Sequence, residues 1–159
     1  VKECGFACRH LTMEQKLCPA YYETPEGKAF IGEIVKLCET EKKIVVDTFD
    51  GEEDIHEYRM IHGIPQADVR FLISESHGHI VKEIVDRRMD VTILMTGGDT
   101  LMGYMKLIGC TQLEPVCEIE PGVVVSMLVW NGYRQQVISK SGGFGTEDIM
   151  GRIAQKIVK

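Results

Sequence analysis

The chain has 159 residues, with 18 lysines and arginines against 24 aspartates and glutamates, so its formal net charge is −6. Its 44% hydrophobic and 26% charged residues are the balance of a folded globular protein and exclude an intrinsically disordered one. The acidic balance argues against nucleic-acid binding, and no apolar run approaches the roughly 20 residues that span a bilayer. We therefore expect a globular protein with no nucleic-acid partner and no membrane partner.

The cysteines and histidines form no recognisable metal-binding pattern. The sequence has six cysteines and five histidines. Cys4 and Cys8 are separated by three residues, and no second close pair of cysteines or histidines completes a tetrahedral set. His77 and His79 lie two residues apart, a spacing that turns their rings away from each other. We predict reduced thiols, no metal site on these side chains, and a cytoplasmic location.

The first half of the chain predicts helices around one short strand. The apolar spacing is helical over Leu11–Cys18 and Gly27–Cys38, and Ile44–Val46 has the continuous apolar pattern of a buried strand. An acidic stretch with glycine and proline over residues 49–67 predicts a loop. Helical spacing returns over Ala67–Met89, with Gly78 as a potential interruption.

The second half begins with a strand, a glycine turn and a helix. Val91–Met95 is a continuous apolar run, which is typical of a strand buried on both faces of a parallel sheet. The sequence Thr-Gly-Gly-Asp-Thr follows directly over residues 96–100. Helical spacing then continues through Leu101 and Ile108 and ends at Gly109.

Further extended segments and one last helix complete the chain. Val116–Ile119, Val123–Trp130 and Gln135–Ser139 predict strands, and Asn131-Gly132 predicts a type I′ hairpin between the last two. A second glycine cluster precedes a helix that we expect to begin near Thr146, with acidic residues in its first turn.

This order of elements predicts the fold class. Strands alternate with helices before a hairpin appears near the end of the chain, a pattern typical of an α/β protein. We predict an α/β domain of three layers, with a mixed, mainly parallel sheet and a C-terminal hairpin. Residues 1–159 have the length of one domain, so we predict a single domain over the whole chain.

Both glycine clusters stand where a strand passes into a helix. At such a point the free N–H groups and the helix dipole favour an anion, and glycine lets the backbone approach a phosphate closely. We expect the two loops at opposite ends of one sheet segment. The candidate phosphate-binding residues are Gly97, Gly98, Asp99 and Thr100 in the first loop and Lys140, Ser141, Gly142, Gly143 and Gly145 in the second.

The glycine patterns alone leave a purely structural alternative open. Neither loop matches GxxxxGK[ST] or GxGxxG, the two common nucleotide-binding patterns. Gly97 and Gly98 are equally compatible with a tight turn, in which Asp99 or Thr100 caps the following helix. Two such loops close together in one chain favour an anion-binding cleft.

Three motifs in the second half of the chain resemble a known family. TGGDT after a buried strand, then EIEPGVVV, then ISKSGGFGTEDIM resemble the nucleotide-binding C-terminal domain of the four-carbon acid sugar kinases, where such motifs occur in this order. The resemblance covers Thr92 to Met150. Near the start of the chain, Thr12-Met13-Glu14-Gln15 resembles a Thr-x-x-Gln element of the same domain.

The resemblance implies a phosphotransferase that moves the γ-phosphate of ATP to a hydroxyl of a four-carbon acid such as threonate or erythronate, with Mg²⁺ bridging the phosphates. It implies nucleotide contacts at both glycine loops, and a structural bend at Glu118 and Pro121-Gly122. The catalytic base is unknown, because the family's acid-sugar site lies on a preceding domain with an Asp-Asp-x-Thr-Gly motif that this sequence does not contain. We expect this chain to be the nucleotide half of such a kinase and not to be competent alone.

A second departure from the family concerns the start of the chain. Gly5-Phe6-Ala7-Cys8-Arg9 stands where the family has a serine-rich turn, and Arg9 or His10 could donate to a phosphate instead. The alternative function is a non-catalytic module that senses a nucleotide or a phosphate. The expected partners are a nucleotide and an acid sugar held by another domain, and a homo-oligomer is compatible with the sequence.

A few other side chains could line a nucleotide cleft. Asp47 and Thr48 follow a predicted strand, and ligands of α/β proteins bind at the carboxyl ends of strands. Tyr104, Trp130 and Phe144 could stack on adenine, with hairpin packing favoured for Trp130.

Overall fold

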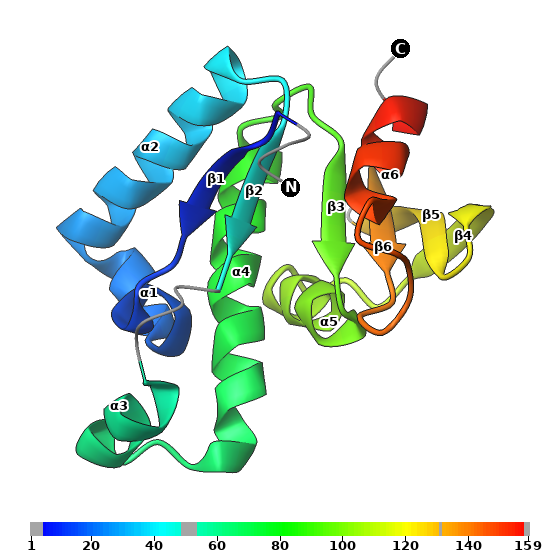
Figure 1. Cartoon of the computed structure of the whole chain (residues 1–159). Coiled ribbons are helices and arrows are strands. Elements are labelled where there is room, and N and C mark those ends of the chain that lie inside the picture. The colour runs from blue at the N-terminus through cyan, green and yellow to red at the C-terminus, as the bar shows by residue number, and fades with distance from the viewer. Residues whose placement is uncertain (1–4, 49–53, 131, 158–159) are drawn as a thin grey trace.

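The computed structural model describes residues 5–48, 54–130 and 132–157, and Figure 1 shows how their helices and strands are arranged. The described α-helices are α1 (Met13–Leu17), α2 (Pro25–Thr40), α3 (Ile55–His62), α4 (Val69–Asp86), α5 (Gly98–Leu107) and α6 (Ile149–Ile157), and η2 (Pro19–Glu23) and η3 (Gln66–Asp68) are short 3-10 helices. The described strands are β1 (Ala7–His10), β2 (Ile44–Asp47), β3 (Ile93–Thr96), β4 (Leu113–Glu120), β5 (Val123–Trp130) and β6 (Tyr133–Lys140).

Two sheets form the framework of the described residues. The larger sheet has the strand order β3-β6-β5-β4, and the smaller one joins β1 and β2. β1 runs parallel to β2 and β3 parallel to β6, while β5 is antiparallel to both β4 and β6. The predicted α/β class, the mixed sheet and the C-terminal hairpin are confirmed. The pairings are evenly divided between parallel and antiparallel, because β4 extends the hairpin by a further antiparallel strand.

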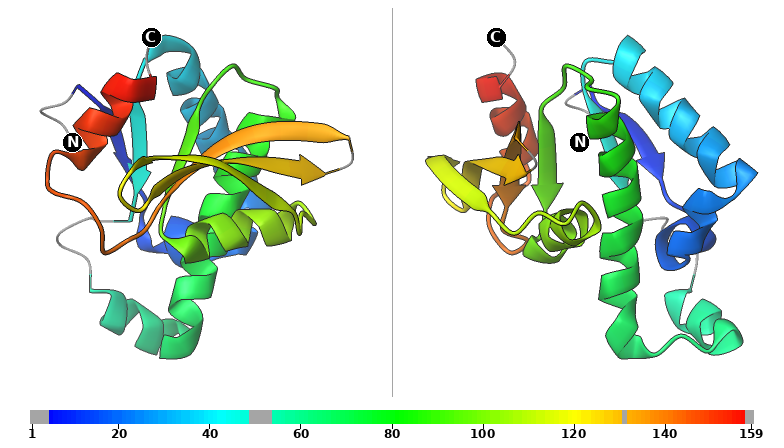
Figure 2. Two further views of the ribbon diagram at one scale, coloured as in Figure 1. Left: turned by 90° about the vertical axis from the view of Figure 1, so that its right-hand side faces the viewer. Right: turned by 180° about the vertical axis from the view of Figure 1, so that it is seen from behind.

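Side-chain alternation along β3 and β6 explains the three layers. Ile93 and Met95 on one face of β3 pack with residues of α4 and α5 in one apolar cluster. Leu94 and Ile138 on the opposite face pack against α6 in another. Successive strand residues point to opposite faces, so both faces of this sheet carry helices. Seen from behind, α4 crosses the space between the β1–β2 pair and β3 (Figure 2).

The first two predicted helices are confirmed, with boundaries set by threonine caps. Thr12 precedes α1, where its hydroxyl accepts from the Gln15 N–H and its own N–H donates to the Gln15 side chain. The Thr-x-x-Gln element is therefore a capping box. Thr24 caps α2 by accepting from the Gly27 N–H at 3.0 Å, so that this helix begins two residues earlier than predicted.

The long helix α4 is continuous through Gly78, where a potential interruption was predicted. A Cβ atom on Gly78 would lie 3.3 Å from the Gly103 carbonyl oxygen of α5. A Cβ atom on Gly103 would lie 2.6 Å from the Ser74 carbonyl oxygen of α4. The two glycines thus let the backbones of α4 and α5 approach closely, which holds the middle of α5 against the long helix.

The prediction of a loop over residues 49–67 is wrong for its second part, because Ile55–His62 form the helix α3. Residues 49–53 lie outside the described residues. Asp54 caps this helix by accepting from the His56 N–H at 2.7 Å, and Gly63 ends it with a φ of 66°. Ile55 and Tyr58 pack against Val69 and the apolar side of α1. The acidic and polar composition hid a two-turn helix whose apolar contacts are few.

The predicted strands of the second half are confirmed, and β5 has the predicted bounds. β6 is longer than predicted at both ends, and α5 ends before Gly109, which has a φ of 67°. Asn131 lies outside the described residues. Its neighbours Trp130 and Tyr133 are paired across the hairpin, and Gly132 has the positive φ that the predicted turn requires.

Candidate functional site

The two glycine loops leave the same edge of the larger sheet. β3 ends at Thr96 and β6 ends at Lys140, and these two residues are partners in the parallel register. The Gly97 N–H donates to the Lys140 carbonyl oxygen at 2.8 Å, so the loops are tied together at their first residues. The prediction that they lie at opposite ends of a sheet segment is wrong. β5 reverses the direction of β4, and β6 reverses it again, which brings β6 back parallel to β3.

The first loop presents the amino end of α5. Gly97 precedes the helix with a φ of 89° and makes no side-chain cap, so the alternative in which Asp99 or Thr100 caps the helix is wrong. Thr100 instead donates its hydroxyl to the Thr96 carbonyl oxygen at 3.1 Å. The first N–H groups of a helix have no partner within the helix, so those of Gly98 and Asp99 face outward at the positive end of its dipole.

The second loop is a short turn between β6 and α6. The Ser141 N–H donates to the Gly122 carbonyl oxygen at 2.9 Å, and the Phe144 N–H donates to the Ser141 carbonyl oxygen at 3.3 Å. Gly145 has a φ of 101°, and a Cβ atom there would lie 2.9 Å from Ile149. Gly145 is therefore required by the turn itself.

Gly142 and Gly143 are not required in this way. A Cβ atom on either residue would have no neighbour within 4 Å, and neither residue has a positive φ. Both are exposed, as are the flanking residues of the loop. Packing in the described structure does not explain glycine at these positions. A ligand that approaches the backbone closely does explain it.

A buried cation lies at the base of the second loop. Lys140 is 7% exposed, and its Nζ donates to the Ser141 carbonyl oxygen at 3.0 Å. This contact orients the first peptide of the loop. It also places a positive charge close to the point where the two loops begin, which favours an anion there.

The bend predicted at Glu118 and Pro121-Gly122 supports the second loop. Glu118 accepts from the Gly122 N–H at 2.8 Å, and Gly122 has a φ of 73°. A Cβ atom on Gly122 would lie 3.0 Å from the Phe144 side chain, so the bend also packs against the loop.

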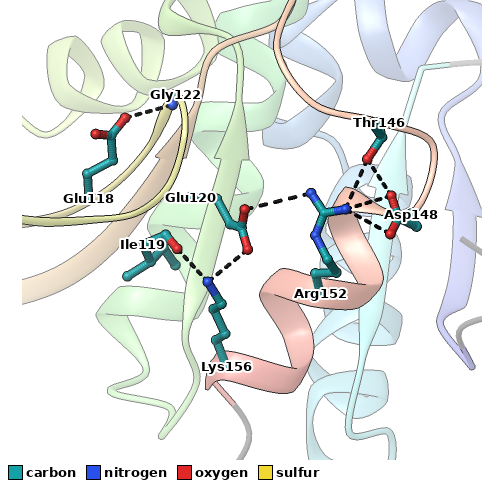
Figure 3. A network of polar contacts seen from close by, with 8 residues as sticks. All are labelled: Glu118, Ile119, Glu120, Gly122, Thr146, Asp148, Arg152 and Lys156. Carbon is teal, nitrogen blue, oxygen red and sulfur yellow. Dashed lines mark hydrogen bonds and ion pairs between the residues drawn. The ribbon is translucent and has the colours of Figure 1, made fainter.

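A network of ion pairs fixes α6 behind the second loop (Figure 3). The Arg152 guanidinium donates to both Asp148 carboxylate oxygens, at 2.9 and 2.8 Å, and to the Thr146 hydroxyl at 3.1 Å. Lys156 lies 2.8 Å from a Glu120 oxygen and donates to the Ile119 carbonyl oxygen at 2.7 Å. The helix itself begins at Ile149, three residues later than predicted, because residues 146–148 form the turn that this network holds.

The network predicts an acid-sensitive contribution to stability. The Lys156 hydrogen bond holds the pKa of Glu120 below its ordinary value of 4.5, and the Thr146 hydroxyl lowers that of Asp148. Carboxyl groups with a lowered pKa in the folded state stabilise it above their unfolded pKa, and this contribution is lost as the pH falls through the folded pKa. We expect Glu120→Gln to lower Tm slightly at neutral pH, and this Tm difference should shrink as the pH falls below 4.5.

Thermal unfolding of the native and Glu120→Gln proteins across this pH range tests the prediction. The Tm difference should also shrink in high salt, because the pairs are near the surface. A Tm difference that is independent of pH would show that the Glu120 charge does not contribute.

A cleft of about 700 Å³ opens beside the first loop. Thr96 and Thr100 line it, as do Asp47 and Thr48 at the end of β2, where the sequence predicted cleft-lining residues. The Lys16 Nζ, on a side chain that is 3% exposed, donates to the Thr48 carbonyl oxygen at 3.2 Å.

Comparison with known proteins identifies the family. The model of the family described as "Nucleotide-binding C-terminal domain" matches residues 11–150. The chain belongs to this family. Both glycine loops lie within the matched residues, and so does the cleft end formed by Asp47 and Thr48. No curated protein sequence matches the chain.

Solved structures share the fold of this nucleotide-binding domain. A Bordetella bronchiseptica protein with a domain of unknown function (DUF1537), described as a domain-swapped dimer with bound citrate, is 18% identical with a TM-score of 0.65. A Haemophilus influenzae DUF1537 protein is also 18% identical with a TM-score of 0.65. A putative tRNA synthase from Salmonella typhimurium LT2 is 14% identical with a TM-score of 0.68.

The chain spans only about a third of these relatives. The matches cover 97% of this chain but 35% of the Bordetella and Haemophilus chains, and 98% of this chain but 36% of the Salmonella chain. At such low sequence identities the likeness shows the fold alone.

The aromatic side chains of the nucleotide-binding domain divide into core and loop residues. Tyr104 is fully buried, so the prediction that it could stack on a base is wrong. Trp130 packs edge-to-face on Tyr133 across the hairpin, as favoured from the sequence. Phe144 is 59% exposed within the second loop and stays a candidate for stacking on a base.

Arg9 and His10 lie on β1, a strand that was not predicted from the sequence because two of its four residues are polar. The Arg9 guanidinium donates to the Cys8 carbonyl oxygen, and the His10 Nδ1 lies 2.6 Å from an Asp47 carboxylate oxygen. Their described contacts are local to the β1–β2 pair, so a phosphate contact from either residue stays a prediction.

Within residues 5–48, 54–130 and 132–157 the five cysteines are free thiols, and no three potential ligands among histidine, cysteine, aspartate and glutamate gather at one point. Across these same segments, no helix combines the length and the apolar character needed to cross a membrane.

Proposed function

We propose that this chain is the ATP-binding domain of a sugar-acid kinase, which transfers the γ-phosphate of ATP to a hydroxyl of a four-carbon acid such as threonate or erythronate. The observation that carries the proposal is the junction of two open glycine loops at one sheet edge, in a chain of a nucleotide-binding family. The sequence motifs of both loops resemble those of the four-carbon acid sugar kinases. In this proposal residues 1–159 act as a single nucleotide-binding domain of a cytoplasmic enzyme.

The two loops would hold the phosphates from two sides. The outward N–H groups of Gly98, Asp99 and Thr100 at the start of α5 offer donors and the positive end of a helix dipole. The N–H groups of Gly142 and Gly143 offer a second set of donors, because these open glycines let a phosphate reach the amides. Ser141, whose N–H is bonded to the Gly122 carbonyl oxygen, and Gly145 would shape the turn that presents them. Gly97 supplies the turn that joins the two sets.

Lys140 would act at the point where the two loops begin. Its ammonium group is held by the Ser141 carbonyl oxygen, so its position is fixed before a ligand arrives. A fixed positive charge lowers the cost of bringing the negative charge of a phosphate group against the loops. We assign Lys140 a positioning and electrostatic role, since phosphoryl transfer depends mainly on these two effects.

Asp99 has the type of side chain that proteins use to hold a nucleotide-bound magnesium ion. Mg²⁺ is commonly held through one or two carboxylates together with substrate phosphates and waters. Asp99 lies exposed in the first turn of α5, and within the described residues its carboxylate has no hydrogen-bond or ion-pair partner. Mg²⁺ would neutralise charge on the phosphates, while Asp99 would hold one of the waters on the ion.

The proposed acceptor sugar acid binds to another domain, so we propose that this chain is not competent alone. The relatives of solved structure are almost three times as long as the matched region. One of them is described with bound citrate, a small polycarboxylic acid, and as a domain-swapped dimer. These descriptions are compatible with an acid substrate and with a homo-oligomer for the present protein.

A non-catalytic module that senses a nucleotide or a phosphate is the second candidate. It is favoured by the segment Gly5–Arg9, which enters strand β1 where the kinase family has a serine-rich turn. A sensor needs the two loops and does not need an acceptor site.

Mixing the chain with a separately produced acid-sugar-binding domain of the kinase family separates the two candidates. With Mg²⁺, ATP and threonate or erythronate, the kinase hypothesis predicts that ADP and a phosphorylated acid form only when both proteins are present. ATP binding without phosphoryl transfer to any four-carbon acid would contradict the kinase hypothesis and favour the sensor hypothesis.

A further inference from the structure

The cleft of about 700 Å³ separates two strand edges. It is lined by the whole of β2, from Ile44 to Asp47, by the whole of β3, from Ile93 to Thr96, and by Thr92 just before β3. Among the described strands, β2 pairs only with β1, and β3 pairs only with β6, so each has its second edge toward this cleft. The arrows of β2 and β3 point the same way in Figure 1.

Helices cover the cleft on both sides. Ile80 and Ile84 of α4 line it from one side, and Ile153, Ala154 and Ile157 of α6 line it from the other. Strands of a parallel sheet are normally flanked in this way, with helices over both faces and a strand on each edge. The cleft therefore has the surroundings of an inner strand position.

The exposure of β2 also indicates that a strand is missing beside it. Its Ile-Val-Val sequence is continuously apolar, which predicts a strand buried on both faces. All four residues of β2 are nevertheless only half-buried. An apolar strand with an open edge leaves backbone N–H and C=O groups without a sheet partner beside apolar walls, which is an unfavourable arrangement.

We propose that the cleft between β2 and β3 is a docking site for one extended, apolar polypeptide strand that comes from outside this chain. Such a strand would run parallel to β2 and β3, hydrogen-bond to both, and join the two sheets into one. Its β-branched side chains would alternate between the apolar surfaces of α4 and α6. This is recognition by strand addition, with two edges in place of the usual one.

The pairing of the described strands indicates that the added strand comes from outside this chain. Each described strand already belongs to a sheet, so a second copy of this chain would have to give up one of its own pairings to fill the cleft. The relatives of solved structure contain about twice as much further polypeptide as the part that matches this chain. A strand in the cleft would end beside Thr96 and Thr100, and would thus form one wall of the nucleotide site.

A peptide with a known strand sequence tests the proposal. The probe is the sequence of residues 91–96, Val-Thr-Ile-Leu-Met-Thr, which contains β3; it is acetylated, amidated and preceded by two lysines for solubility. The readout is hydrogen exchange of the backbone amides of β2 and β3, followed by NMR on the full chain. We expect the probe to slow exchange of amides on both strands at least tenfold. A matched probe with N-methyl groups at alternate peptide bonds should have no effect, because it cannot pair.

Two variants give the control in the protein. Ala154→Trp fills the cleft from α6 without removing a contact and should abolish the protection, whereas Ala29→Trp on the exposed surface of α2 should leave it unchanged. Four results would overturn the proposal: no protection at saturating probe, equal protection by the N-methylated probe, protection that persists in Ala154→Trp, and protection that rises with protein concentration without the probe. The last result would assign the cleft to a second copy.

Discussion

Replacing Gly143 by valine is expected to reduce the affinity for Mg²⁺-ATP at least tenfold, which is a loss of about 1.4 kcal/mol or more. Gly143 is exposed, has no positive φ, and has open space where a Cβ atom would stand. The valine side chain therefore fits the ligand-free loop but occupies the space through which a phosphate would reach the loop amides. Calorimetric titration of ATP with Mg²⁺ into both proteins measures the difference.

A valine placed away from the loops provides the control for this variant. Gly32 lies on the exposed surface of α2 with the same open surroundings, so Gly32→Val should bind ATP as the native chain does. Thermal unfolding should show that Gly143→Val is folded. Equal affinity in Gly143→Val and the native chain would remove the second loop from the nucleotide site.

Replacing Gly103 by alanine is expected to lower the stability by about 2 kcal/mol and Tm by about 4–8 °C. The added Cβ atom would lie 2.6 Å from the Ser74 carbonyl oxygen and 2.8 Å from the Ser74 Cβ. The backbones of α4 and α5 would have to separate, which disturbs the packing around the fully buried Tyr104. This cost exceeds the roughly 1 kcal/mol that alanine gains over glycine within a helix.

The gain from helix propensity can be measured separately in α2. Gly32→Ala adds a Cβ atom with no neighbour within 4 Å, so it should raise stability by up to about 1 kcal/mol. Denaturant unfolding of the two variants gives the opposite signs directly. Stabilisation by Gly103→Ala would show that the helices do not approach as closely as described.

The local part of the fold could be predicted from the sequence. The strand β5 and the hairpin turn follow from apolar runs and turn residues that act over a few neighbouring positions. Both glycine loops were located because glycine clusters between a strand and a helix have a local physical cause. The helix α3 was missed, because its cap at Asp54 lies in an acidic stretch and its apolar contacts come from distant segments.

The assembly of the site could not be predicted in the same way. Whether the two loops share a sheet edge depends on the register of Thr96 with Lys140, a pairing between residues far apart in the chain. The burial of Tyr104 depends on the close approach of α4 and α5 at their glycines. The cleft beside β2 is visible only in three dimensions, because the apolar sequence of that strand predicts full burial.

The central claim is that the two loops form one phosphate-binding site, and amide chemical shifts measured during an ATP titration test it most directly. With Mg²⁺ present, we predict that the amides of Gly97–Thr100 and Ser141–Gly145 shift together, with one common dissociation constant. Shifts confined to one loop, or centred on residues away from both, would contradict the claim.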